Sequence, residues 1–150
     1  MAEQVCVDAS LVIMLLLPHD LSAKAKALWQ SWAERNTETV TAPLFFAEVT
    51  SVLRENVYFG RILVEEGEQA FATFMKFGIK SMEPLDLQPR SWALAKEYNR
   101  SRAYDAQYLA VATALGCDLW TGDHRLVNAV RAPWLRWIGD HAGRSTPTQS

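Results

Sequence analysis

Short β-prone segments alternate with longer helical segments along almost the whole of this 150-residue chain. We expect strands at 5–7, 39–42, 79–82, 118–121 and 135–138. Helices are expected at 10–18, 22–34, 43–60, 64–77, 92–100, 104–115 and 124–130, with Ser10 capping the first. Strands that alternate with helices form a parallel sheet through right-handed crossovers, and helices cover both faces of that sheet. The pattern therefore predicts an α/β fold.

The length and composition fit one globular domain. Hydrophobic residues make up 49% of the chain and charged residues 21%, which is typical of a globular protein with its own core. We expect the folded domain to span residues 1–138. The segment 139–150 is rich in Gly, Ser, Thr and Pro and is expected to be a flexible tail. The N-terminus lacks the basic start of a signal peptide, and the apolar run 11–17 is too short to cross a membrane, so a cytoplasmic location is expected.

Four carboxylates are expected at one edge of the predicted sheet. Asp8 and Asp123 each follow a strand, whereas Glu48 and Asp105 lie in the first turns of helices that begin at the same edge. Ligands of open parallel sheets bind just beyond the carboxyl ends of the strands. The four acids are therefore predicted to converge, although they are far apart in the sequence.

The surroundings of these acids favour a metal site. Asp105 shares a helix face with Tyr108 and Leu109, and a carboxylate in an apolar stripe is costly unless a cation or hydrogen-bond donors satisfy it. Ligands that are all oxygen atoms suit Mg²⁺ or Mn²⁺ better than zinc. Taken singly, each acid has another explanation: Asp8 or Asp123 could cap a helix, Asp105 could stabilise a helix dipole, and Glu48 could lie on the surface.

Four segments resemble successive blocks of PIN domains, most closely those of VapC-type toxins: VCVDASLVIMLL, TAPLFFAEVTSVLRE, AYDAQYLAVATALGCDLWTGDHRLVNAV and WLRWIG. The resemblance implies a Rossmann-like three-layer α/β/α fold and an endoribonuclease that depends on Mg²⁺ or Mn²⁺. The family's acidic positions fall on Asp8, Glu48, Asp105 and Asp123, which would be both metal ligands and catalytic residues. Ser10 and Thr121 would support these acids by hydrogen bonds. An RNA substrate, a homodimer and a small antitoxin partner are also implied.

Several interpretations remain open beside this one. A PIN domain could process RNA without being a toxin, or bind RNA or protein without cutting. A haloacid-dehalogenase-type phosphatase also begins with a strand that ends in Asp, but it needs a second Asp where this chain has Ser10. Tyr104 and Trp120 could stack on an RNA base, but core packing is the favoured expectation for both. The basic residues nearest the acidic segments could contact the RNA backbone or be ordinary surface charges: Arg54, Lys96, Arg100, Arg102 and Arg125.

Overall fold

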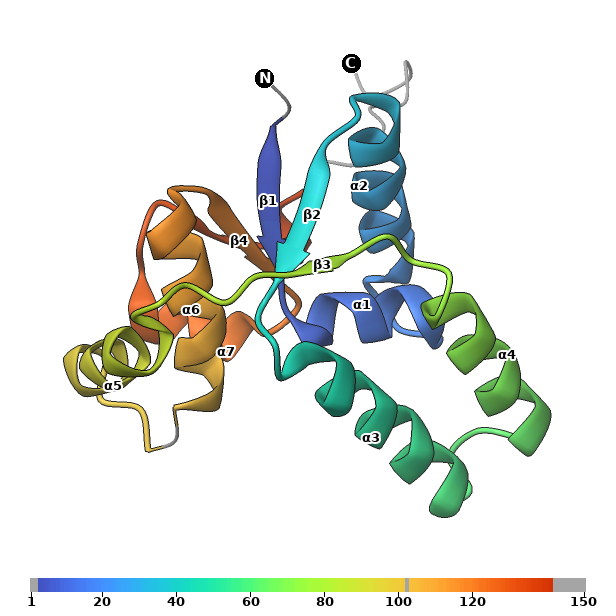
Figure 1. Ribbon diagram of the computed structural model, residues 1–150. Helices are drawn as coiled ribbons and strands as arrows, with labels where there is room; N and C mark the ends of the chain where they lie inside the picture. Colours follow the sequence, from blue (N-terminus) through green and yellow to red (C-terminus); the bar gives the residue numbers. More distant parts are fainter. Residues whose placement is uncertain (1–2, 102, 142–150) are drawn as a thin grey trace.

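The protein forms a five-stranded parallel sheet, seen in a computed structural model that describes residues 3–101 and 103–141 (Figure 1). The strand order is β3-β2-β1-β4-β5, and every neighbouring pair is parallel. The strands are β1 (Gln4–Val7), β2 (Glu38–Thr41), β3 (Lys80–Ser81), β4 (Asp118–Thr121) and β5 (Leu135–Trp137). Strands β2 and β3 are added on one side of β1, and β4 and β5 are added on its other side. Strands β1 and β4 are therefore neighbours near the centre of the sheet.

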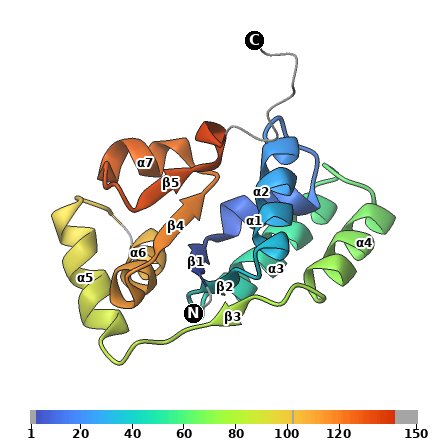
Figure 2. The same ribbon diagram turned by 90° about the horizontal axis from the view of Figure 1, so that it is seen from above.

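Helices cover both faces of this sheet (Figure 2). One layer contains α1 (Ala9–Leu16), α2 (Ser22–Glu34), α3 (Phe45–Tyr58) and α4 (Val64–Phe74). The other layer contains α5 (Leu87–Glu97), α6 (Tyr104–Leu115) and α7 (His124–Val130), and the 3-10 turn Ile138–Asp140 follows β5. The predicted α/β fold with three layers is confirmed.

The core is centred on β1, β4 and α6. Cys6 and Val7 of β1 and Leu119 of β4 are completely buried. Helix α6 is buried over an unbroken run, Ala106 to Ala112, because it packs on both β1 and β4. This rigid centre fixes the carboxyl ends of β1 and β4, where Asp8 and Thr121 lie.

Several predicted boundaries are wrong. Asp8, not Ser10, caps α1, and its side chain accepts a hydrogen bond from the backbone N–H of Leu11. Helix α4 ends at Phe74 rather than at residue 77, so Met75 is largely exposed. Helix α5 begins at Leu87 rather than at residue 92, because a proline at residue 89 is tolerated in a first helical turn.

The predicted tail lies mostly outside the described residues. Gly139 and Asp140 belong to the 3-10 turn, so regular structure extends two residues past the predicted end of the domain. Residues 142–150 are outside the described part of the chain. In residues 3–101 and 103–141, no helix is both long enough and apolar enough to span a bilayer.

Candidate active site

Asp8 lies at the point where β1 passes into α1. Its backbone is extended, and its side chain is buried, with only 6% of the residue exposed. The Oδ1 atom accepts hydrogen bonds from the Ser10 hydroxyl at 2.6 Å and from the Leu11 N–H at 3.1 Å. The Thr121 hydroxyl donates to Oδ2 at 2.5 Å. Asp8 therefore caps α1, and these three hydrogen bonds hold its own carboxylate in a fixed position.

Two hydroxyl groups connect Asp8 to the loop that follows β4. The Ser10 hydroxyl accepts a hydrogen bond from the Gly122 N–H at 2.8 Å, and the Thr121 hydroxyl accepts one from the Asp123 N–H at 3.0 Å. A Cβ on Gly122 would lie 3.3 Å from the carbonyl carbon of Ser10. Glycine thus permits the close approach that brings the loop against α1.

Burial raises the pKa of Asp8 from 3.8 to about 6. Hydrogen bonds from Ser10, Thr121 and Leu11 oppose this effect, whereas the negative charge of Asp105 adds to it. Among the described residues, no basic side chain forms an ion pair with Asp8. Within residues 3–101 and 103–141, the carboxylate is consequently a buried negative charge that hydrogen bonds stabilise.

Glu48 is fixed by a tyrosine of another helix. Glu48 lies in the first turn of α3, and its Oε1 atom accepts a hydrogen bond from the Tyr108 hydroxyl of α6 at 2.7 Å. Burial, together with the neighbouring Glu48 carboxylate, raises the pKa of Tyr108 above its ordinary value. The phenol therefore stays protonated and acts as a donor to Glu48.

Asp105 and Asp123 each face an arginine. Asp105, in the first turn of α6, forms an ion pair with Arg100 at 3.1 Å. Asp123 caps α7 by accepting a hydrogen bond from the Arg125 N–H at 3.0 Å, and the Arg125 Nε atom lies 3.6 Å from its Oδ1 atom. The capping explanation that the sequence left open thus applies to Asp123 as well as to Asp8.

The structure brings the predicted residues together to different degrees. Asp8, Ser10 and Thr121 are in direct contact, and Asp123 is joined to them through its backbone. Asp105 is close enough to raise the pKa of Asp8. Within residues 3–101 and 103–141, however, no three acidic, histidine or cysteine side chains are arranged closely enough to hold a metal ion as they stand. A shared metal centre therefore remains a prediction.

Sequence reasoning missed two residues of this site. The sequence places Tyr108 three positions after Asp105, on the same helix face, but that spacing does not reveal its hydrogen bond to Glu48 of another helix. Gly122 stands between Thr121 and Asp123, and nothing in the sequence alone indicates that its N–H contacts Ser10.

Comparisons with known proteins identify the family of this chain. Residues 5–132 match the sequence profile of the PIN domain. The chain belongs to the PIN-domain family. It is 31% identical over 117 residues to a VapC ribonuclease of Mycobacterium bovis and to ribonuclease VapC9 of Mycobacterium tuberculosis. The aligned segment covers 75% of this chain and 90% of each relative.

Solved structures share the PIN fold at lower sequence identity. A toxin–antitoxin complex from Klebsiella pneumoniae has a TM-score of 0.62 and 19% identity, and the match covers 87% of this chain and 94% of that one. A protein from Pyrobaculum aerophilum has a TM-score of 0.61 and 21% identity, and the match covers 93% of this chain and 92% of that one. VapC20 of Mycobacterium tuberculosis, a sarcin-ricin loop cleaving toxin, has a TM-score of 0.61 and 20% identity, and the match covers 83% of this chain and 94% of that one. These likenesses support the fold.

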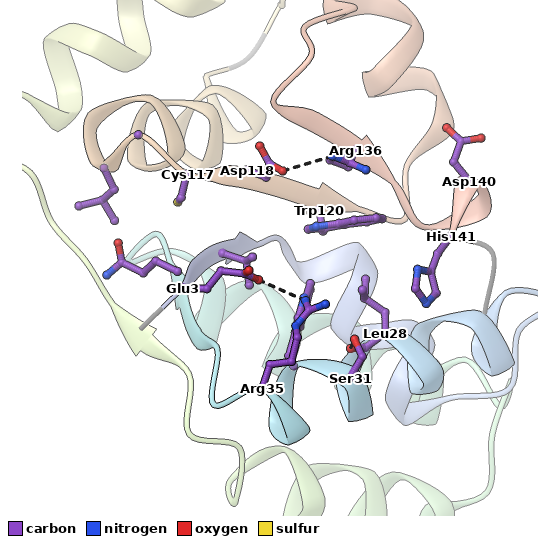
Figure 3. Close-up of a pocket in the computed structure, with 15 residues that line it drawn as sticks. Glu3, Leu28, Ser31, Arg35, Cys117, Asp118, Trp120, Arg136, Asp140 and His141 are labelled. Carbon is purple, nitrogen blue, oxygen red and sulfur yellow. Dashed lines mark hydrogen bonds and ion pairs between the residues drawn. The ribbon is translucent and has the colours of Figure 1, made fainter. Parts of the chain in front are cut away.

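The PIN domain also has a cavity of about 640 Å³ at the opposite end of the sheet, where β1 and β4 begin (Figure 3). Helix α2 forms one wall and β4 with β5 the other. Ion pairs lie on both walls, Arg35 with Glu3 at 3.2 Å and Arg136 with Asp118 at 3.5 Å. None of the four predicted acids lines this cavity, so it is separate from the candidate active site.

The predicted RNA contacts of the PIN domain differ in accessibility. The Arg125 side chain is 93% exposed beside Asp123, whereas Arg100 is engaged with Asp105. Arg54 lies over the ring of Tyr58, and Lys96 is exposed. Arg102 lies outside the described residues. Trp120 is buried as expected, but the expectation of core packing is wrong for Tyr104, which is 63% exposed next to Asp105.

Proposed function

We propose that this protein is a metal-dependent endoribonuclease that acts in the cytoplasm as the toxin of a VapBC-type toxin–antitoxin pair. Membership of the PIN-domain family and the similarity to proteins named VapC ribonucleases support this function. The observation that carries the proposal is Asp8, a buried carboxylate at the carboxyl edge of a parallel sheet with no basic partner in the described chain.

The chemistry of the donor groups at this edge suits Mg²⁺ or Mn²⁺. All four proposed ligands, Asp8, Glu48, Asp105 and Asp123, offer carboxylate oxygens, which these ions prefer. Asp8 and Asp105 would hold the ion most strongly, while Glu48 would bind it or orient water and Asp123 would complete the site. The Ser10 and Thr121 hydroxyls would keep the Asp8 carboxylate in place, because residues that hydrogen-bond a metal ligand commonly fix its orientation. A divalent ion held there would supply charge stabilisation at the scissile phosphate.

The proposed substrate is RNA, which would lie across the carboxyl edge of the sheet. The chain has a net charge of −2, so tight non-specific binding is not expected. Arg125, which is exposed beside Asp123, would contact a phosphate near the site. Attack by water on the phosphodiester would leave a 5′ phosphate on one product and a 3′ hydroxyl on the other.

A small antitoxin protein is the proposed partner, and a homodimer the proposed assembly. Large exposed apolar side chains lie where α3 passes into α4: Phe59, Leu63 and Val64. Exposed apolar patches commonly mark protein interfaces. The match to a toxin–antitoxin complex concerns the fold, so the identity of the partner rests on this proposal.

The test is cleavage of a mixed pool of structured RNAs by the purified full chain in Mg²⁺, in Mn²⁺ and in EDTA. Asp8→Asn is the critical variant, because it keeps the shape of the side chain and removes its charge. Asp20→Asn is a matched control, since Asp20 is an exposed acid outside the site. We expect cleavage that requires a metal ion, leaves 5′ phosphates, and is lost only in Asp8→Asn.

Two outcomes would contradict the proposal. Cleavage that survives in EDTA, or in Asp8→Asn, would show that the acids are not the catalytic centre. No cleavage of any RNA by folded protein free of partner, together with no Mn²⁺ binding by calorimetry, would favour a PIN domain that binds RNA or protein without cutting it.

A further inference from the structure

Tyr108 connects the two helical layers at the candidate active site. It lies on α6, and its hydroxyl donates to Glu48 of α3, 60 positions away in the sequence, at 2.7 Å. Helices α3 and α6 belong to opposite layers (Figure 2). The hydrogen bond therefore fixes the position of one proposed ligand relative to the helix that carries another, Asp105.

The environment of this contact makes it more than an ordinary surface hydrogen bond. Only 2% of Tyr108 is exposed, so packing on all sides holds its ring in one orientation. Glu48 is partly exposed, and in residues 3–101 and 103–141 it has no other hydrogen bond or ion pair. The phenol engages Oε1, which leaves Oε2 available to a cation or to water.

We propose that Tyr108 is a positioning residue that holds Glu48 ready for a divalent metal ion. A glutamate has three rotatable side-chain bonds, and a ligand that is already ordered loses less conformational entropy when it binds. Tyr108 acts through Glu48 and does not touch the substrate. This inference rests on the proposed metal-dependent function of the same site.

The test combines metal titration with a double-mutant cycle on the full chain. Tyr108→Phe removes only the hydroxyl, Glu48→Ala removes the ligand, and the double variant combines both changes. Tyr58→Phe is the matched control, because Tyr58 is an exposed tyrosine at the far end of α3. Mn²⁺ affinity is measured by isothermal titration calorimetry, and the melting temperature is measured by circular dichroism. RNA cleavage is assayed at saturating Mn²⁺.

We expect Tyr108→Phe to weaken Mn²⁺ binding by roughly 10- to 100-fold, the usual effect of losing a residue that orients a ligand. Cleavage should recover in part when Mn²⁺ is raised to saturation. In the Glu48→Ala background the same substitution should have no further effect on Mn²⁺ affinity. Tyr58→Phe should bind Mn²⁺ like the wild-type chain. If Tyr108→Phe melts early, the titration is carried out well below its melting temperature.

The outcomes separate this inference from the proposed function. If wild-type protein binds Mn²⁺ and cuts RNA but Tyr108→Phe has the same affinity, the inference alone is wrong. An equal loss of affinity in the wild-type and Glu48→Ala backgrounds would show that Tyr108 is merely structural. If the wild-type chain binds no Mn²⁺, the proposed function fails, and the inference fails with it.

Discussion

Thr121, the last residue of β4, donates a hydrogen bond to Asp8, which follows β1, although 113 positions separate the two residues. The same hydroxyl accepts the backbone N–H of Asp123. One buried side chain therefore joins two central strands and connects two of the four proposed metal ligands.

Replacing Thr121 with valine tests the energetic importance of this connection. The substitution keeps the volume of the side chain but leaves an Asp8 oxygen and the Asp123 N–H without their partner. We expect a loss of about 1–3 kcal/mol in the free energy of unfolding, because buried polar groups without partners cost about that much. Urea denaturation measures the change. Thr121→Ser is the control, since it retains the hydroxyl, and equal stability of the wild-type and valine forms would contradict the prediction.

The buried charge of Asp8 should make stability depend on pH. Because the pKa of Asp8 is raised from 3.8 to about 6, the unfolded state releases this proton first as the pH increases. The contribution of Asp8 to stability is therefore greatest below about pH 4, falls between about pH 4 and pH 6, and stays low above that range. The difference corresponds to about 3 kcal/mol at about 1.4 kcal/mol for each pKa unit.

Asp8→Asn should consequently stabilise the metal-free protein near neutral pH by up to about 3 kcal/mol, because the amide carries no buried charge. The gain should disappear below about pH 4, where the aspartate is neutral in both states. Urea denaturation in EDTA at several pH values measures this difference. A gain that is the same at every pH, or a loss near neutral pH, would show that burial of the charge is not the cause.

Binding of a metal ion should offset the free-energy cost of burying the Asp8 charge. We expect Mg²⁺ or Mn²⁺ to raise the melting temperature of the wild-type chain, and removal by EDTA to reverse the effect. At a free metal concentration about 100 times the dissociation constant, the stabilisation is about 2.7 kcal/mol. Asp8→Asn should respond much less, because it lacks the central ligand. Equal responses of the two proteins to metal would place the ion elsewhere.

Arg125 offers a test of RNA contact that is separate from catalysis. Its side chain is 93% exposed, so Arg125→Gln should leave the melting temperature unchanged. RNA binding should weaken. In a plot of the logarithm of RNA affinity against the logarithm of salt concentration, the slope should become less steep by slightly less than one unit if one phosphate contact is removed. Arg131→Gln, which changes an arginine at the C-terminal end of α7, is the control. Equal affinity and slope in the wild-type and Arg125→Gln proteins would show that Arg125 is an ordinary surface charge.

Much of the fold could be predicted from periodicity alone. Helix α2 and helix α6 have the predicted bounds, because apolar spacing identifies long helices and Gly116, in a left-handed conformation, ends α6. The boundaries of α4 and α5 could not be predicted, since tertiary contacts decide where a regular pattern stops. The order of the strands in the sheet could not be predicted, because no local sequence pattern specifies which strands pair.

The candidate site was predictable in its position but not in its contacts. Asp8 and Asp123 follow strands, so their edge of the sheet could be predicted from the sequence. The capping role expected for Ser10 is wrong, because a hydroxyl near a helix start usually caps that helix, whereas here Asp8 is the cap. Ser10 instead donates a hydrogen bond to Asp8, in line with the supporting role that the family resemblance implied. The contact between Tyr108 and Glu48 depends on how two distant helices pack, which sequence spacing does not determine.

Gly122 provides a last test, of the close approach between the loop and α1. A Cβ at this position would lie 2.6 Å from the Met14 Cε atom and 3.3 Å from the Ser10 carbonyl carbon. The end of a methionine can move, but the backbone of Ser10 is held by α1. We expect Gly122→Ala to cost about 1–3 kcal/mol in unfolding free energy, as overpacking usually does. In a Met14→Ala background, which lacks both the Sδ and the Cε atom that this Cβ would approach, the cost of Gly122→Ala should be smaller but not zero. No cost in that background would show that only Met14 restricts the loop, and unchanged stability of Gly122→Ala would show that the loop can move away from Ser10 without loss.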